Sequence, residues 1–289
     1  MQRPIVNSFG MKVSKLHIKK GAVIFFIMVF AFLLCSVNNG AMADNLTGRS
    51  ESSAGKTIAK KYKVRVLATF PHDRHSYTQG LFFNKGVMYE SAGQYGESSF
   101  RIVDYKTGSL KKRWNFNAKY FLEGSCIFGN NIYILTWQEH SCFVYSADKF
   151  KKVGVASYPT EGWGLTTDGK EMIMSDGSST LYFMDPASFY CTRRINVTLN
   201  GAPLKWINEL EYIDGLVWAN VYETDKMVMI DPKTGIVKAE LDCSGILSAS
   251  LKKADTDVLN GIAYNPLDGG IYITGKYWPR LFRIANPLR

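Results

Sequence analysis

The sequence predicts an all-β protein folded as a five-bladed β-propeller. From Tyr62 onward, short runs of Tyr, Val, Ile, Phe and Trp alternate with polar residues and are separated by Gly, Asn and Asp turns, which is the pattern of β-strands. No stretch of useful length carries a helical period. One hairpin pattern recurs five times at intervals of 40 to 52 residues. A period of this size with four strands per unit is typical of propeller blades.

Each repeat reads as a strand, a tight turn and a second strand, followed by a third strand that ends in an acidic or turn signal. The five hairpins are YTQGLFFNKGVMYESAG, FLEGSCIFGNNIYILTWQ, EGWGLTTDGKEMIMSDG, WINELEYIDGLVWANVY and VLNGIAYNPLDGGIYITGK. A fourth strand follows in the first four repeats, whereas the fifth repeat ends at Arg289 after three strands. The strand pattern at 61–70 belongs to no repeat. We therefore expect this N-terminal strand to pair with the last blade and close the ring. A β-sandwich is the alternative, but it would not need five matching hairpins.

Residues 1–43 have the features of a secretory signal peptide. They carry five Lys or Arg and no Asp or Glu, and they contain an apolar run at 22–37 and a small-x-small site that ends at Ala43. Cleavage after Ala43 and a secreted or periplasmic location are expected, with a retained membrane anchor as the alternative. Residues 44–60 are rich in Ser, Gly and Lys and predict a flexible linker. The catalytic domain is expected at 61–289.

The charge of the chain indicates a solvated surface. Removal of the signal peptide would lower the formal net charge from +10 to about +5, because five cations and no anions lie in it. No basic block is interleaved with aromatic residues, so no nucleic-acid partner is expected. We expect a monomer that has no contact with the membrane after cleavage.

Four cysteines remain in the predicted mature chain. The even number suits an oxidising compartment, but buried thiols and disulfides are both compatible with it. Their spacing matches no zinc site, and His72 and His75 form an H-x-x-H pair without further ligands nearby. The sequence therefore predicts no metal site. The four cysteines are Cys126, Cys142, Cys191 and Cys243.

Glu123 is the candidate for proton transfer. It lies in the stretch YFLEGS at 120–125, between aromatic residues and a Gly-Ser pair, at the start of a strand pattern. Apolar surroundings favour the protonated form of a carboxyl group, which suits acid–base chemistry near neutral pH. The alternative is a glutamate that caps a turn or pairs with a lysine.

The repeats predict which other residues lie near Glu123. In a propeller, the first strand of each blade lines the central channel. The repeat-equivalent positions that should converge there are Gln79, Glu123, Trp163, Asn208 and Asn260. The loops after the second strands should supply a second ring, with Trp137, Tyr222 and Lys276. Packing explains any one of these residues, but the whole set favours a functional site.

Seven ordered motifs in this chain resemble the glutaminyl cyclases of the plant and bacterial type, which are also called glutamine cyclotransferases. The motifs are PHD with YTQGL, FLEGS, EGWGL, NELEY, WANVY, LNGIAY and TGKYWPRLF, and they cover nearly the whole predicted mature chain. The resemblance implies a five-bladed propeller that converts the N-terminal glutamine of a peptide or protein into pyroglutamate and releases ammonia. It also implies a reaction without a metal or cofactor.

The resemblance also implies roles for residues at matching positions. The catalytic glutamate falls on Glu123, and the pocket residues fall on Gln79, Phe121, Trp137, Trp163, Asn208 and Lys276. Tyr77 stands where Phe is common, Tyr222 where Trp is usual and Arg74 where Pro is frequent. An aromatic face survives at Tyr77 and Tyr222, which we assign to the substrate pocket.

The expected reaction needs an acid–base group and an anion stabiliser. Glu123 would take a proton from the attacking amine and return it to the leaving nitrogen, and Lys276 would stabilise the negative oxygen of the intermediate. A salt bridge between Lys276 and Glu123 that only fixes the pocket is the alternative role of the lysine. Desolvation and Lys276 shift the pKa of Glu123 in opposite directions, and the sequence leaves the net direction open.

Two other classes of function are compatible with a propeller. A glycosidase would pair Glu123 with Glu161, Asp176 or Glu209. A non-catalytic propeller would bind a peptide or carbohydrate at its axis. Replacement of Glu123 separates catalysis from binding alone.

Overall fold

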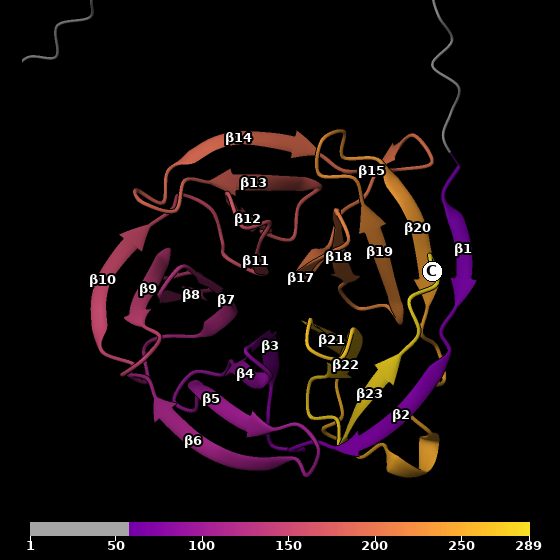
Figure 1. The fold of residues 1–289 in the computed structure, drawn as a ribbon, viewed down its shortest axis with the longest axis horizontal. Coiled ribbons are helices and arrows are strands. Elements are labelled where there is room, and N and C mark those ends of the chain that lie inside the picture. Colours follow the sequence, from indigo (N-terminus) through magenta and orange to yellow (C-terminus); the bar gives the residue numbers. More distant parts are fainter. Residues whose placement is uncertain (1–57) are drawn as a thin grey trace, which may run out of the picture. The chain divides into compact units, whose positions relative to one another are not determined.

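A computed structural model describes residues 58–289 and shows five β-sheets arranged as blades around a central axis (Figure 1). The predicted signal peptide and residues 44–57 of the predicted linker lie outside the described residues. Within 58–289, no helix is long and apolar enough to cross a membrane. A 3-10 turn, η1, covers Ala249–Leu251.

Blades 1 to 3 are antiparallel sheets whose four strands follow one another in chain order from the axis outward. Blade 1 consists of β3 (Thr78–Asn84), β4 (Val87–Ala92), β5 (Ser99–Asp104) and β6 (Ser109–Asn115). Blade 2 consists of β7 (Leu122–Phe128), β8 (Asn131–Thr136), β9 (Ser141–Ser146) and β10 (Lys152–Ser157). Blade 3 consists of β11 (Leu165–Thr167), β12 (Met172–Met174), β13 (Thr180–Met184) and β14 (Cys191–Asn196). A small hairpin follows blade 3 and consists of β15 (Thr198–Leu199) and β16 (Ala202–Pro203).

Blades 4 and 5 take additional strands from the start of the described chain. Blade 4 consists of β17 (Ile207–Ile213), β18 (Leu216–Val221), β19 (Lys226–Ile230), β20 (Val237–Asp242) and β1 (Lys60–Lys63). Blade 5 consists of β21 (Leu259–Asn265), β22 (Gly270–Gly275), β23 (Arg280–Ile284) and β2 (Val66–Pro71). Strand β1 runs parallel to β20, whereas β2 runs antiparallel to β23.

The segment predicted as one strand at 61–70 is therefore two strands that belong to neighbouring blades. The chain passes from one sheet to the next at Val64 and Arg65, and the strand-forming residues on both sides of this point give no sign of the change of partner. The folded domain also begins slightly before residue 61. Ala59 is buried, and its N–H donates to Oδ1 of Asn200 at 2.8 Å.

Four of the five inner strands are interrupted at the same structural position. The pairing with the second strand shifts register within β3, β7, β17 and β21. A β-bulge takes residues out of the regular ladder and redirects their side chains. The residues within these irregularities include Gln79, Glu123, Asn208 and Asn260. The strands thus change their local direction at the positions that the repeats predicted to converge.

The glycine after Glu123 allows blades 2 and 3 to approach each other closely. The N–H of Gly124 donates to the carbonyl oxygen of Trp163 at 2.7 Å. A Cβ atom on Gly124 would lie 2.6 Å from that oxygen, which is too close for any side chain. The E-G-S motif therefore fixes the backbone of Glu123 against the entry of Trp163 into blade 3.

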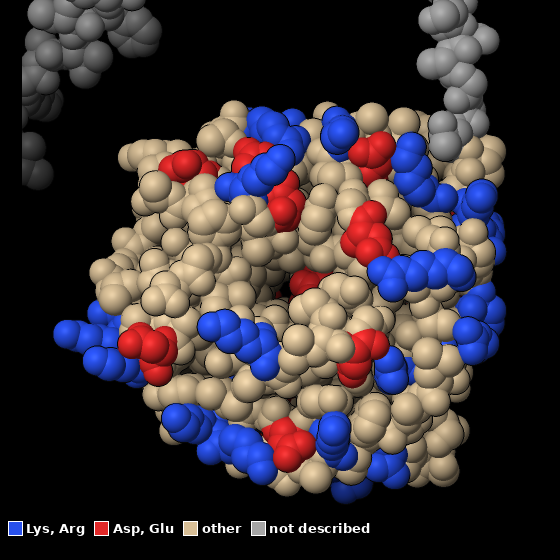
Figure 2. Space-filling model, in the orientation of Figure 1, with Lys and Arg blue, Asp and Glu red and all other residues tan. Residues whose placement is uncertain are grey.

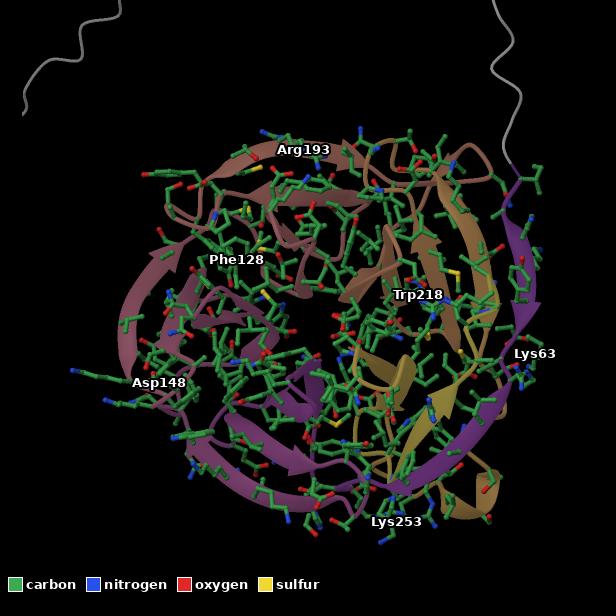
Figure 3. The ribbon with its side chains drawn as sticks, in the orientation of Figure 1. Lys63, Phe128, Asp148, Arg193, Trp218 and Lys253 are labelled. Atoms are coloured by element: carbon green, nitrogen blue, oxygen red, sulfur yellow. The ribbon has the colours of Figure 1, made fainter. Side chains whose placement is uncertain are left out.

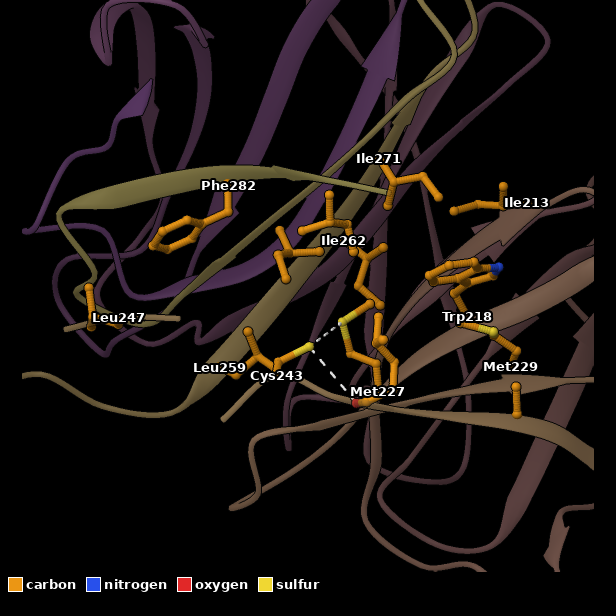
Figure 4. Packing of buried hydrophobic residues seen from close by; sticks show 14 of the residues in the cluster. Ile213, Trp218, Met227, Met229, Cys243, Leu247, Leu259, Ile262, Ile271 and Phe282 are labelled. Carbon is orange, nitrogen blue, oxygen red and sulfur yellow. Dashed lines mark hydrogen bonds between the residues drawn. The ribbon is translucent and has the colours of Figure 1, made fainter. Parts of the chain in front are cut away.

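Hydrophobic side chains fill the spaces between neighbouring blades. Between blades 4 and 5, Trp218 and Met227 pack with Ile262 and Phe282 in one buried cluster (Figure 4). Cys243 belongs to this cluster, with its sulfur 3.7 Å from the sulfur of Met227. All four cysteines of the described chain are free thiols, and three of them are buried, so disulfides do not hold this structure together.

Two glutamates on β17, the buried Glu209 and the half-buried Glu211, accept hydrogen bonds from backbone N–H groups of other blades. The carboxylate of Glu209 accepts the N–H groups of Leu81 in blade 1 and Ile262 in blade 5, at 3.2 and 2.7 Å. Glu211 accepts the N–H of Tyr264 at 2.8 Å. Burial raises the pKa of both carboxyl groups, and that of Glu211 rises to about 8.

We expect Glu211 to make the stability of the fold depend on pH. Because its folded-state pKa lies above the ordinary value, its contribution is complete at low pH and is lost as the pH rises toward 8. The variant Glu211→Gln keeps a carbonyl oxygen for the N–H of Tyr264 and cannot ionise. Urea unfolding measures the free energy of unfolding of both proteins at pH 5 and pH 8.5. The difference, variant minus wild type, should be larger at pH 8.5 than at pH 5 by at least about 1 kcal/mol. Parallel changes in the two proteins would contradict this role.

Candidate active site at the propeller axis

A cavity of about 330 Å³ lies where the inner strands and their following loops converge. On the face seen in Figure 2 the molecule is hollowed at the centre of the ring, and Figure 3 shows side chains reaching inward around the axis. Nine of the ten residues predicted at the axis line this cavity, and Asn260 is the exception. The lining consists of Tyr77, Gln79, Phe121, Glu123, Trp137, Trp163, Asn208, Tyr222 and Lys276, together with Gln94 and Trp206.

The lining residues differ in burial, which indicates the depth of the cavity. The polar side chains of Gln79, Glu123, Asn208 and Lys276 are buried. Most of the aromatic residues are half-buried, and Trp206 is exposed. The cavity therefore has a polar interior, an aromatic wall and an open rim.

Glu123 is joined by hydrogen bonds to two carboxamide groups, and the resulting network connects three blades. Its Oε1 atom accepts a hydrogen bond from Nε2 of Gln79 at 2.8 Å. The Oε1 atom of Gln79 accepts in turn from Nδ2 of Asn260 at 3.2 Å. The backbone carbonyl of Glu123 accepts from the hydroxyl of Ser91 at 2.5 Å. These contacts hold the carboxyl group in one orientation.

Burial is the largest influence on Glu123 and raises its pKa well above the ordinary value. The positive charge of Lys276 opposes this shift, whereas the negative charges of Glu161 and Glu139 add to it. The net direction that the sequence left open is therefore upward. A carboxyl group with a raised pKa can both donate and accept a proton closer to neutral pH.

Lys276 is held by aromatic rings. Its Nζ atom lies 4.7 Å from the ring centroids of both Tyr77 and Tyr222, which is within the range of cation–π attraction. Lys276 and Glu123, both in the described chain, form no direct salt bridge. The salt bridge that was considered as an alternative role of the lysine is therefore absent here. Burial lowers the pKa of Lys276, while Glu123 and Asp257 raise it. The two tyrosines thus supply an aromatic cage at the positions where the resemblance showed departures.

Glu161 positions two walls of the cavity. Its Oε2 atom accepts the indole N–H of Trp137 at 2.7 Å and that of Trp163 at 2.9 Å. Its Oε1 atom accepts from Nε2 of Gln138 at 3.1 Å. These bonds lower the pKa of Glu161 and keep it ionised. The EGWGL motif therefore links its glutamate to the tryptophan two residues later.

Phe121 fills the cavity wall on the side of blade 2. It is 8% exposed and packs edge-on against both Tyr77 and Trp137. A Cβ atom on Gly93 would lie 2.3 Å from the Phe121 ring, so this glycine leaves the space that the ring occupies. Phe121 both packs and lines the cavity.

Asn208 has an unused polar atom. Its Oδ1 is buried without a hydrogen-bond partner in the described structure, whereas its backbone carbonyl accepts from the hydroxyl of Ser175 at 2.7 Å. Buried polar atoms are normally paired, so this oxygen is available to a donor that enters the cavity.

The remaining candidates have other partners and do not line the cavity. Asn260 was predicted to converge with the others, but it is fully buried and donates to the carbonyl of Thr78 and to Gln79. Among the proposed glycosidase partners of Glu123, Glu209 accepts backbone N–H groups and Asp176 accepts the hydroxyl of Tyr182 at 2.9 Å.

His72 belongs to a buried network between blades 1 and 5. Its ring nitrogens contact the carbonyl of Trp278 at 2.8 Å and Glu90 at 3.2 Å. Burial opposes ionisation of both groups, but their mutual attraction raises the pKa of His72 and lowers that of Glu90 to about 2. Within residues 58–289, no three His, Cys, Asp or Glu side chains are grouped as they would be around a metal ion.

Trp206 and Gln94 line the cavity but were missed from the sequence. Gln94 follows the second strand of blade 1 by two residues, whereas Trp137, Tyr222 and Lys276 follow theirs by one. A search of two positions after each second strand would have found it. Trp206 comes directly before β17 and stands two residues before Asn208, as Tyr77 and Phe121 stand before Gln79 and Glu123, so the repeat pattern offered a signal for it.

The fold and the cavity define a propeller in which a buried acid and a buried lysine face one small axial pocket, which is an arrangement suited to acid–base catalysis. The family model for glutamine cyclotransferase matches residues 38–285. This chain belongs to the glutamine cyclotransferase family.

Two similar proteins agree with this assignment. A glutaminyl-peptide cyclotransferase of Arabidopsis thaliana is 36% identical over 273 residues, which cover 93% of this chain and 81% of the relative. The crystal structure of Myxococcus xanthus glutaminyl cyclase matches with a TM-score of 0.73 and 31% identity, covering 78% of this chain and 97% of that one.

We expect the variant Lys276→Met to raise the pKa of Glu123 further. The methionine has a similar length but no charge, and the lysine is the main influence that lowers this pKa. Isotope-edited infrared titration of the carboxyl bands would measure the change. Lys226→Met, which alters an exposed lysine at the start of β19 in blade 4, should leave the titration of Glu123 as it is. An unchanged or lower pKa in Lys276→Met would contradict this electrostatic link.

Proposed function

We propose that this protein is a glutaminyl-peptide cyclotransferase that converts the N-terminal glutamine of peptides or proteins into pyroglutamate and releases ammonia. Family membership supports the reaction. The main support for the site is that Glu123 is buried in the same cavity as Lys276. The cavity of about 330 Å³ suits a single side chain with its amine rather than a long ligand.

The substrate supplies both reacting groups. Its free α-amine attacks the carbonyl carbon of its own side-chain amide, and this ring closure is intramolecular. Holding the side chain bent toward the amine therefore removes much of the entropic barrier. The aromatic wall excludes water from the bent side chain, and Gln79 and Asn208 offer polar atoms to its amide and amine.

Glu123 moves the proton that the reaction requires. Attack by the neutral amine forms the new C–N bond and moves the carbonyl electron pair onto oxygen, whose negative charge Lys276 stabilises. The Glu123 carboxylate takes the proton from the ring nitrogen and gives it to the departing amide nitrogen. The C–N bond of the former amide then breaks, the carbonyl reforms and ammonia leaves. The carboxylate is thereby regenerated.

The variant Glu123→Gln should lower kcat for ammonia release from a Gln-initiated peptide by at least about a hundredfold, because a carboxamide cannot shuttle the proton. Gln can still accept a hydrogen bond, so folding and peptide binding should persist. Near-UV circular dichroism and calorimetric titration provide these controls. Near-native turnover in the variant would rule out Glu123 as the acid–base group, and persistent binding by a wild type that releases no ammonia would indicate a binding propeller.

We also propose that the reaction needs no metal. The cavity lining, which belongs entirely to the described chain, offers one carboxylate and no histidine or cysteine. Dialysis against EDTA should therefore leave the rate of cyclisation unchanged. Loss of activity that zinc or calcium restores would contradict the proposal and would direct attention to Asp73 and His75.

We further propose that the protein is exported to the periplasm or beyond and acts as a monomeric acyltransferase. The support is the sequence pattern of residues 1–43 and the lack of any need for a second subunit to complete the cavity. N-terminal sequencing of the protein from the producing cells tests cleavage after Ala43.

A further inference from the structure

A tryptophan at the rim of the cavity has no role in the proposed reaction. Trp206 lines the cavity and is 52% exposed, whereas every other lining residue is buried or half-buried. Ligand pockets are lined mainly by apolar and aromatic side chains, so an exposed ring that continues such a lining is placed to contact a ligand. The rim of a catalytic pocket is where the remainder of a polymeric substrate has to leave.

Two hydrogen bonds hold the backbone of Trp206 at the rim of the cavity. The residue has a φ of +67°, which is a strained conformation for a bulky side chain. Its N–H donates to the carbonyl of Gly177 at 2.7 Å, and its own carbonyl accepts from the N–H of Tyr222 at 2.8 Å. These two bonds come from the loops of blades 3 and 4 and compensate for the strain.

The ring continues the aromatic wall toward solvent. Its centroid lies 6.2 Å from that of Trp163 and 6.3 Å from that of Tyr222. Tyr222 in turn contacts the ammonium group of Lys276. A path along the wall therefore leads from the buried lysine, past Tyr222, to the exposed ring of Trp206.

This order fixes where the second residue of a substrate would lie. The reacting glutamine must reach Glu123 and Lys276 in the interior, so the next residue lies toward the opening. An apolar side chain that covers the exposed ring removes apolar surface from water on both sides of the contact. Because two hydrogen bonds already order the backbone of Trp206, covering the ring costs only the freedom of its side chain.

We propose that Trp206 forms a subsite for a large apolar side chain at the residue that follows the N-terminal glutamine. This inference rests on the proposed function and adds a preference to it. The subsite would act on binding, so its contribution belongs mainly to KM rather than to kcat.

Steady-state cyclisation of Gln-Phe-Ala, Gln-Lys-Ala and Gln-Gly-Ala by the intact protein tests the subsite. The wild type should show the highest kcat/KM with Gln-Phe-Ala. Trp206→Ala should lower the preference for Gln-Phe-Ala over Gln-Gly-Ala, measured as the ratio of their kcat/KM values, by about fivefold. A loss of this size is within the range measured for aromatic contacts, and it should appear mainly in KM. Trp206→Phe should give an intermediate ratio. Tyr190→Ala, which removes another exposed aromatic residue next to β14, should keep the wild-type ratio.

Three results would overturn the inference. An unchanged ratio in either Trp206 variant would show that the ring does not contact the second residue, and the phenylalanine variant keeps this test available if the alanine variant does not fold. A wild-type preference for Gln-Lys-Ala would assign a cationic class of side chain instead. A wild type that releases no ammonia from any of the three peptides would overturn the proposed function itself and the subsite with it.

Discussion

The desolvation of Glu123 is the physical constraint on which the proposed chemistry depends. A carboxyl group in water is almost fully ionised at neutral pH and is a poor proton donor to a leaving amine. Here the inner strands and an aromatic wall remove it from water, and this burial outweighs the attraction of Lys276. The lysine is itself stabilised by two tyrosine rings rather than by direct contact with the acid. The carboxyl group and the ammonium group therefore both remain available to a substrate.

This environment exists only if the ring of blades is closed. The chain closes it by adding β2 to blade 5 and β1 to blade 4, so that one short N-terminal segment ties two blades together. Nearer the axis, the network of His72 and Glu90 joins blade 1 to blade 5 through the carbonyl of Trp278. The loop that follows His72 carries Tyr77, which lies against Lys276. Closure and the geometry of the site thus use the same segment of the chain.

The repeat pattern predicted the number of blades and most of the residues of the cavity, because a propeller places equivalent positions of each repeat around one axis. Glu123 and Lys276 are 153 positions apart in the sequence and line one pocket. Three features were not predictable in this way. The division of 61–70 into β1 and β2 depends on which sheet edge each half meets.

The other two features depend on local three-dimensional packing. Asn260 occupies a repeat-equivalent position, but its amide turns to the backbone of Thr78 and to Gln79 and does not line the cavity. Trp206 occupies the same repeat position as Tyr77 and Phe121, but no sequence pattern indicated its left-handed backbone conformation or its exposure at the rim. Periodicity therefore predicts positions on the ring, whereas hydrogen-bond partners and loop conformation decide which side chains face the substrate.

The most direct test of the central claim is a crystal structure of Glu123→Gln in complex with a Gln-initiated peptide. We expect the N-terminal glutamine to lie in the axial cavity, with its side-chain carbonyl oxygen directed toward Nζ of Lys276 and its α-amine near residue 123. A peptide bound elsewhere on the propeller, or bound with its first residue outside the cavity, would contradict the account.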